Sequence, residues 1–333
     1  MNKKNNLAYV ALFLVGLLSS LTLDTSAQQR TWVEGNQPQK PIVEHNLLQN
    51  YIKISSLPNN KRPKAFSDLP AYDKANVFKM NLALQFAKRD NLSKEQKDLI
   101  LEAISMVTPA TYDRENIEKR VKSERDALKL QDKSLGIFSP QVAFEIFASI
   151  GGNEEDTKNL QKYQNTVSLP TMLKRRKSFR ESMPADRSSL WKAQMAYYLA
   201  TEKLSKPQQD FILEVITLST IEAFDFPSVK GASKNDATKS LDALEPKAFK
   251  LFPKEDFFRF FMSLGPAEKI LLQNSASNDF VPEEGTACGC VWWCSPCHSC
   301  STGNCDETTS GCGWSLGSPC TGKCVFNMNT CPR

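Results

Sequence analysis

All ten cysteines of this 333-residue chain lie in its last 46 residues, and the 287 residues before them contain none. An even number of cysteines in so short a stretch is typical of a disulfide framework in an exported protein. We therefore predict a small disulfide-rich domain at 288–333, with short strands and turns, behind a body of a different kind. Its predicted disulfide cysteines are Cys288, Cys290, Cys294, Cys297, Cys300, Cys305, Cys312, Cys320, Cys324 and Cys331.

The N-terminus is consistent with export. Lys3 and Lys4 precede a largely apolar run over 7–23, and the small residues up to Ala27 match a signal-peptidase site. A membrane anchor is the alternative, but the apolar run is at the short limit for a bilayer span. We predict a signal peptide at 1–27, cleaved after Ala27, and a secreted or periplasmic bacterial protein that is not an integral membrane protein once the signal is removed.

Two segments have the composition of connections. Residues 28–63 are polar and rich in proline, which predicts a loosely ordered lead-in with one short helix. Residues 266–287 combine serine, asparagine, proline and glycine, which predicts a linker before the cysteines.

An internal repeat lies between these two segments. Residues 92–104 read LSKEQKDLILEAI and residues 204–216 read LSKPQQDFILEVI, with nine of thirteen positions identical. The match extends in both directions, and each copy closes with an aromatic segment that ends in glycine. We predict repeat units at 64–152 and 177–265.

Each repeat has the pattern of helices. Ser93 and Ser205 each precede a glutamine by three residues, which is the spacing of a capping box. Apolar residues then recur at helical intervals. The predicted fold is mainly α, with a duplicated helical repeat domain in which the two copies pack together.

The helical part offers no convincing catalytic set. The chain has two histidines, His45 and His298, so the repeats lack a Ser-His-Asp triad. A carboxylate-dependent hydrolase remains as an alternative, because the repeats carry acids four residues apart on one helix face. These pairs are Asp98 with Glu102 and Asp210 with Glu214. Since they recur beside the caps in both copies, we favour a structural role near the helix ends and predict no enzyme and no cofactor.

A basic run at 174–177, KRRK, is the only concentrated positive charge. We interpret it as a solvated helix start or linker. The formal net charge is +5 for the chain and +4 without residues 1–27, so we expect no nucleic-acid partner.

Metal binding and redox chemistry are alternatives for the cysteine block. Cys294, Cys297 and Cys300 have the spacing of zinc ligands, and His298 or Cys305 would complete a site. A C-x-x-C pair also suits redox catalysis, but no thioredoxin-like pattern surrounds it. We favour five bridges at roughly 2–4 kcal/mol each, since a block of this size cannot build a sufficient core.

Three tryptophans, Trp292, Trp293 and Trp314, are the candidate partner-binding residues of this block. They either cover the disulfides as a small core or form an exposed aromatic patch that meets a lipid interface, a sugar or a receptor. From 288 onward two acidic and two basic side chains cancel, so the block lacks the charge of cationic lytic peptides. Affinity for a target envelope must therefore come from aromatic insertion or a specific receptor.

The tail resembles the fulvocin C-related bacteriocin family. The motifs that carry the resemblance are the C-x-C opening at Cys288, the CSTGNC segment, the Gly311-Cys312-Gly313 triplet and the Pro319-Cys320 pair followed by Cys324. The L-S-x-x-Q helices ahead of the tail are also similar to that family. Extra cysteines in CVWWCSPCHSC and at Cys331 depart from it and imply different bridging.

This resemblance implies an antimicrobial, bacteriocin-like precursor or effector. Its cysteine-rich module would bind a cell-envelope component or protein receptor of the target cell, and the helical repeats would serve as propiece or carrier. The alternative is a non-toxic periplasmic or surface binding protein with the tail as a docking module.

Overall fold

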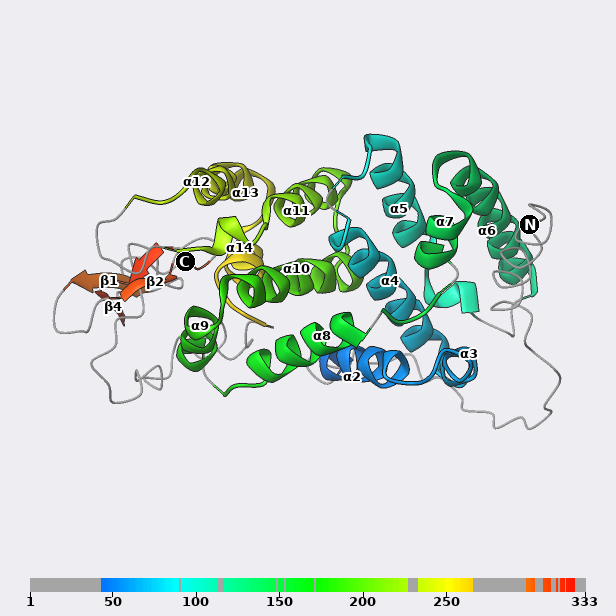
Figure 1. The fold of residues 1–333 in the computed structure, drawn as a ribbon, viewed down its shortest axis with the longest axis horizontal. Coiled ribbons are helices and arrows are strands. Elements are labelled where there is room, and N and C mark those ends of the chain that lie inside the picture. The colour runs from blue at the N-terminus through cyan, green and yellow to red at the C-terminus, as the bar shows by residue number, and fades with distance from the viewer. Residues whose placement is uncertain are drawn as a thin grey trace. The chain divides into compact units, whose positions relative to one another are not determined.

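The computed structural model describes residues 43–265 except 90, 113–116, 148, 153, 171 and 227–232, and residues 298–302, 308–312, 316, 318–320 and 322–326 of the tail. This part of the chain is mainly helical, as predicted (Figure 1). It divides into two compact units, residues 1–158 and 159–333. The repeat predicted at 64–152 lies in the first unit and the repeat predicted at 177–265 in the second, and the packing of the two copies against each other stays a prediction.

Unit 1 is built around the helix α4, which packs against α2, α5 and α7 (Figure 1). From Lys74 onward most side chains of α4 are buried, including polar ones, so the helix forms the centre of the unit. The elements of unit 1 are α2 (Val43–Ser55), α3 (Arg62–Ser67), α4 (Ala71–Ala87), α5 (Lys94–Met106), the 3-10 turn η2 (Pro109–Tyr112), α6 (Ile117–Ile137) and α7 (Pro140–Phe147).

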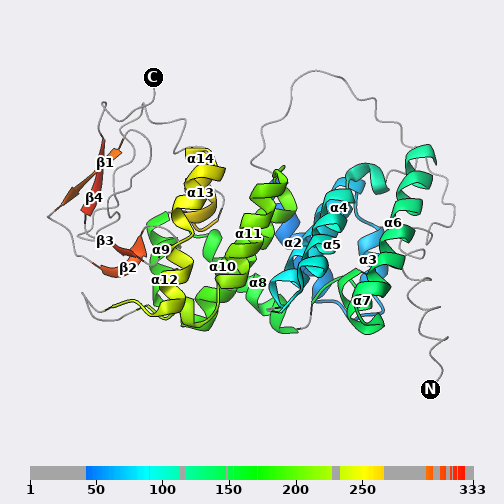
Figure 2. The same cartoon turned by 90° about the horizontal axis from the view of Figure 1, so that it is seen from above.

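Unit 2 repeats this order, with two short helices in place of α6. Its helices α10 and α11 lie side by side in both views (Figures 1 and 2). The elements are α8 (Glu154–Val167), which begins in the last residues of unit 1, and then α9 (Met172–Glu181), α10 (Pro184–Thr201), α11 (Lys206–Leu218), η3 (Glu222–Phe224), α12 (Asp236–Asp242), α13 (Glu245–Leu251) and α14 (Lys254–Phe261).

Both predicted capping boxes are present, at the starts of α5 and α11. In α5 the Gln96 N–H donates to Ser93 Oγ at 3.2 Å, and the Ser93 N–H donates to Gln96 Oε1 at 2.9 Å. Each glutamine also donates across to a later helix end: Gln96 reaches the carbonyl of Ile137 at 3.4 Å, and Gln208 reaches that of Leu251 at 2.9 Å. One side chain thus starts a helix and anchors it to its neighbour.

Aromatic pairs hold the same places in the two units. Phe66 meets Tyr112 edge-on in unit 1, and Phe179 meets Phe224 in unit 2, at ring distances of 5.8 and 5.9 Å. A second pair of rings corresponds around the last helix of each unit. Phe138, before α7, contacts Phe147 at its end, and Phe252, before α14, contacts Phe261 at its end. Edge-to-face pairs of this kind stabilise a core beyond simple burial.

The structural correspondence begins earlier than the predicted bounds of 64 and 177. Helix α2 lies in the lead-in, where one short helix was predicted, and its residues Leu47, Leu48, Tyr51 and Ile54 are all buried. Its counterpart is α8, where Tyr163 is buried as Tyr51 is. Each repeat therefore begins one helix earlier than its predicted bounds, with α2 in unit 1 and α8 in unit 2.

In the tail the described residues form short antiparallel pairs. The strands are β1 (His298–Thr302), β2 (Thr308–Cys312), β3 (Ser318–Cys320) and β4 (Gly322–Phe326), with β1 beside β4 and β2 beside β3. The predicted signal peptide and the predicted linker at 266–287 lie outside the described residues. Within the described ranges, none of the helices has the length and apolar character needed to cross a membrane.

Candidate functional site

Unit 1 contains a cleft of about 730 Å³ between the loop before α3, the end of α4 and the turn after α7. Its lining combines polar side chains with a larger share of apolar surface. The lining residues are Asn59, Asn60, Arg62, Pro63, Gln85, Lys88, Phe144, Glu145, Ser149, Ile150, Gly151 and Gly152.

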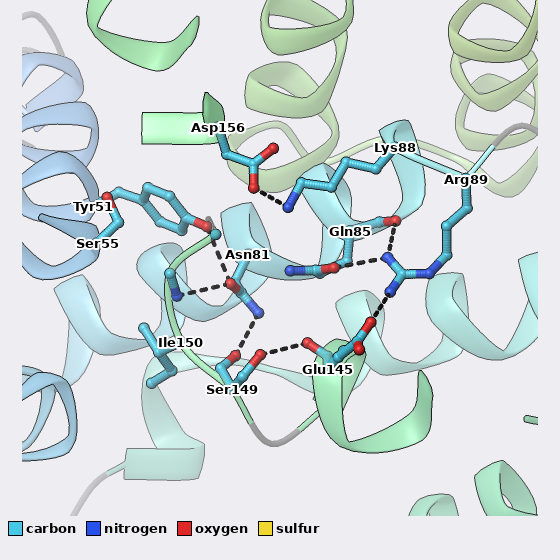
Figure 3. A network of polar contacts seen from close by, with 12 residues as sticks. Tyr51, Ser55, Asn81, Gln85, Lys88, Arg89, Glu145, Ser149, Ile150 and Asp156 are labelled. Carbon is cyan, nitrogen blue, oxygen red and sulfur yellow. Dashed lines mark hydrogen bonds and ion pairs between the residues drawn. The ribbon is translucent and has the colours of Figure 1, made fainter. Parts of the chain in front are cut away.

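Asn81 of α4 lies at the centre of a network of polar contacts that includes cleft-lining residues (Figure 3). Its side chain is fully buried, and its Oδ1 accepts from the Tyr51 hydroxyl and from the Gly151 N–H, both at 3.1 Å. Its Nδ2 donates to the Ser149 carbonyl at 2.9 Å. Burial, with a smaller effect of Asp156, raises the pKa of Tyr51 well above its usual value, so the phenol stays protonated and donates. One amide therefore joins α2, α4 and the turn after α7.

Two glycines make that turn possible. Gly151 has φ +86°, a left-handed conformation that side chains disfavour, and an added Cβ would lie 2.9 Å from Ser55 Cα. At Gly152 an added Cβ would collide with Asp156. The backbone can approach α2 because Gly151 has no side chain, and Gly152 leaves room for Asp156.

The Arg62 guanidinium clamps the same turn to the end of α2. Its Nε donates to the Leu57 carbonyl at 2.8 Å and its Nη2 to the Ser55 carbonyl at 2.7 Å. Its Nη1 lies 3.3–3.4 Å from the carbonyls of 150–152. The Ser55 carbonyl is at the C-terminal end of α2, where the last carbonyls have no partner within the helix. The positive charge of Arg62 also interacts favourably with the negative end of the α2 dipole.

Ion pairs form the rim of the cleft. Lys88 pairs with Asp156, and both side chains are mostly buried. Arg89 donates to Glu145 at 3.0 Å and to the side chain of Gln85 at 2.7 Å (Figure 3). Burial lowers the pKa of Arg89, and the charge of Glu145 opposes that shift. Each carboxylate at the rim therefore already has a cationic partner.

The lining of this cleft does not place a base beside its hydroxyl group. The Ser149 hydroxyl, which lines the cleft, donates to the carbonyl of Glu145 at 2.6 Å, and the lining includes no histidine that could activate it. Over the described ranges, no group of three or more His, Cys, Asp and Glu side chains is arranged to hold a metal. The cleft offers side-chain amides, such as those of Asn59 and Asn60, beside apolar surface from Pro63, Phe144 and Ile150.

Each carboxylate of the predicted acid pairs forms an ion pair with a lysine. Asp98 pairs with Lys94 one turn away, and Asp210 pairs with Lys206 in the same way. Glu102 of α5 pairs with Lys133 of α6, and Glu214 of α11 pairs with Lys247 of α13. All four carboxylates are partly exposed, so the geometry agrees with the structural role we favoured for them.

The interpretation of the basic run as solvated is wrong for two of its residues. The run lies on α9, where Arg175 and Arg176 are buried. Arg175 donates to the Val167 carbonyl at the end of α8, and Arg176 donates to the Met262 carbonyl. Burial, together with the charge of Arg175, lowers the pKa of Arg176 to about 10.

These arginines correspond to the Arg62 clamp of unit 1, which sequence reasoning missed. The signal was present, because Lys61-Arg62 precedes Phe66 at the spacing by which Lys174-Arg175 precedes Phe179. Such a match carries little weight alone, since basic residues are common on helix surfaces. The common role of Arg62 and Arg175 becomes clear only from their hydrogen bonds to the end of the preceding helix, which no local sequence pattern reveals.

Most tail candidates lie outside the described residues. These are Cys288, Cys290, Trp292, Trp293, Cys294, Cys297, Cys305, Trp314 and Cys331. The other four cysteines lie on strands, and the register of β1 with β4 places Cys300 directly opposite Cys324. His298 begins β1, and His45 lies in α2.

Comparisons with protein-family models, with curated proteins and with solved structures find no match to this chain.

Proposed function

We propose that this chain is an exported, bacteriocin-like precursor or effector whose disulfide-rich C-terminal module binds a component of the target-cell envelope. The observation that carries the proposal is the partition of the cysteines, all of which follow residue 287. A module that depends on bridges has a stability independent of a helical core. It keeps its shape if it is released from the helical body.

The helical body supports a carrier role in this proposal. Its candidate carboxylates are ion-paired with lysines in the same positions of both repeats. Its buried amides and arginines bind its own backbone. Side chains used in this way build a scaffold, and recognition is left to the tail with its three tryptophans.

The strand register adds a specific bridge to the proposal. Residues directly opposite each other in an antiparallel pair have Cα atoms about 4.5–5.5 Å apart, which falls within the range that a disulfide spans. Cys300 and Cys324 are opposite in this sense. We infer that they form one of the five bridges of the module.

Intact-mass analysis of the exported protein before and after reduction tests the proposal. We expect a species cut between residues 266 and 287 that gains the mass of ten hydrogens on reduction, and a peptide map that links Cys300 to Cys324. The oxidised tail should inhibit related bacteria, and the reduced, alkylated tail is its matched control. Recovery of only the intact chain, with an oxidised tail that leaves those bacteria unaffected, would contradict the proposal.

The cleft of unit 1 favours a second candidate, a binding protein that works as an intact chain with the tail as a docking module. A cleft of about 730 Å³ is within the usual size of small-molecule sites. This candidate predicts no cleavage before Cys288. It also predicts saturable cell binding by the intact protein that an excess of oxidised tail displaces without inhibiting growth.

A further inference from the structure

The two repeats contain the same ion pair with opposite polarity. In unit 1 Arg89, just after α4, donates to Glu145 of α7 at 3.0 Å. In unit 2 Glu202, just after α10, accepts from Arg259 of α14 at 2.7 Å. The cation therefore follows the central helix α4 in unit 1, whereas in unit 2 it belongs to the last helix, α14.

Contacts independent of charge show that these positions are equivalent. Asn81 of α4 binds the Ser149 carbonyl and the Gly151 N–H. Gln194 of α10 binds the corresponding Ser263 carbonyl and Gly265 N–H. The same helix pair and the same glycine turn are thus in register in both units. Arg89 lies eight residues beyond Asn81, as Glu202 lies eight beyond Gln194.

Three of the four charged side chains are mostly buried, so the interaction between their charges is only partly screened by solvent. Side-chain exposure is 19% for Arg89, and 18% and 24% for Glu202 and Arg259. Glu145 is more open at 46%. Arg259 also lies 4.6 Å from the ring centre of Phe260, so its position is set by the core as well as by its partner. Charges that are partly removed from water are screened less than surface charges.

Exchange of helices between the repeats would bring like charges together. If α4 paired with α14, Arg89 would face Arg259, which keeps Asp256 of its own helix as a partner at 2.9 Å. If α10 paired with α7, Glu202 would face Glu145. Like charges placed opposite each other at an interface disfavour the wrong pairing. The hazard is real, because the repeats are similar in sequence and tandem repeats tend to misassemble.

A difference in side-chain length acts in the same direction. Asn81 is the shorter amide, and its Oδ1 also accepts from Tyr51. Gln194 is one methylene longer, and its Nε2 also donates to the Phe260 carbonyl at 2.8 Å. Each amide fits its own turn, so an exchanged helix would leave buried polar groups unsatisfied or overpacked.

We propose that the reversed ion pair is a specificity determinant for repeat pairing: it keeps each central helix with the last helix of its own repeat while the chain folds. This inference concerns the assembly of the body and is independent of the function proposed for the tail. It also predicts that α4 of one copy of the chain does not pair with α14 of a second copy.

Charge reversals in the full-length oxidised protein test the proposal. The variant R89E/E145R keeps an attractive pair in unit 1 but makes its polarity the same as in unit 2. After refolding from urea we expect its yield of native monomer, measured by size-exclusion chromatography, to fall about twofold or more below wild type. The control K94E/D98K reverses a pair within a single helix and should refold as wild type does.

A fourfold variant separates pairing from local damage. R89E/E145R/E202R/R259E, combined with Asp256→Asn because Asp256 also pairs with Arg259 at 2.9 Å, reverses both ion pairs and restores the opposite polarity of the two repeats. We expect it to regain most of the wild-type yield. The proposal is overturned if the double variant refolds as well as wild type, or if the fourfold variant does not improve on the double variant.

Discussion

At the residue scale, two glycines fix the positions where each repeat closes. Gly151 and Gly265 have nearly the same left-handed φ, +86° and +88°. An added Cβ at Gly265 would lie 2.7 Å from Val167 Cβ, the position equivalent to the contact with Ser55 in unit 1. Both glycines are required for two reasons at once, the backbone conformation and the closeness of the preceding helix.

Gly151→Ala and Gly265→Ala should each lower the free energy of unfolding by about 1–3 kcal/mol, because a side chain is strained at this φ and meets the helix. Gly136→Ala is the control, since its added Cβ has nothing within 4 Å. It lies in α6, where alanine is favoured by up to about 1 kcal/mol. Urea unfolding followed by far-ultraviolet circular dichroism measures all three. Equal stabilities would contradict the role assigned to the turns.

At the element scale, the helix starts were predictable because their signals are local. A capping box involves residues three apart, so Ser93 and Ser205 with their glutamines could be found in the sequence and are confirmed. The sequence did not show that helices α2 and α8 belong to the repeats, because few of their residues match between the copies. They belong to the repeats through burial against the rest of each unit, as for Tyr51 and Tyr163.

Ser93→Ala and Ser205→Ala should each lower the free energy of unfolding by about 1 kcal/mol, the usual effect of removing an N-cap. Ser105→Ala provides the comparison within α5. The Ser105 hydroxyl donates to the carbonyl of Glu102 inside the helix, so its loss should have almost no effect or stabilise slightly. Denaturant titration of the three variants measures the difference. A cost at Ser105 equal to that at Ser93 would show that capping is not the cause.

At the scale of the whole molecule, the chain separates two ways of stabilising a fold. The helical body, residues 43–265, contains no cysteine and relies on apolar burial and on buried amides and guanidinium groups. The tail from residue 288 onward is rich in cysteine and glycine. Under the proposed function the two parts are stabilised independently.

A reductant should therefore leave the thermal unfolding of the helical body unchanged within about 2 °C, since no bridge contributes to it. Circular dichroism of the full-length protein with and without reductant measures the helical transition. The protein with its thiols reduced and alkylated serves as the matched control for re-oxidation during heating. A clear fall of the midpoint in both reduced samples would mean that the tail stabilises the body.

Features of composition and short-range order were readable in the sequence. The helical body, the two capping boxes and the position of the cysteines depend on residues a turn apart or on simple counts. The tertiary structure supplied the rest. From the sequence, Arg175 was interpreted as part of a solvated run, but in the structure it is buried and donates to the carbonyl at the end of α8. Arg89 and Glu145 are 56 residues apart, and Glu202 and Arg259 are 57 apart. Local preferences act within a turn or two, whereas partners at such distances are chosen by packing, so their reversed polarity becomes visible only when the helices are in place.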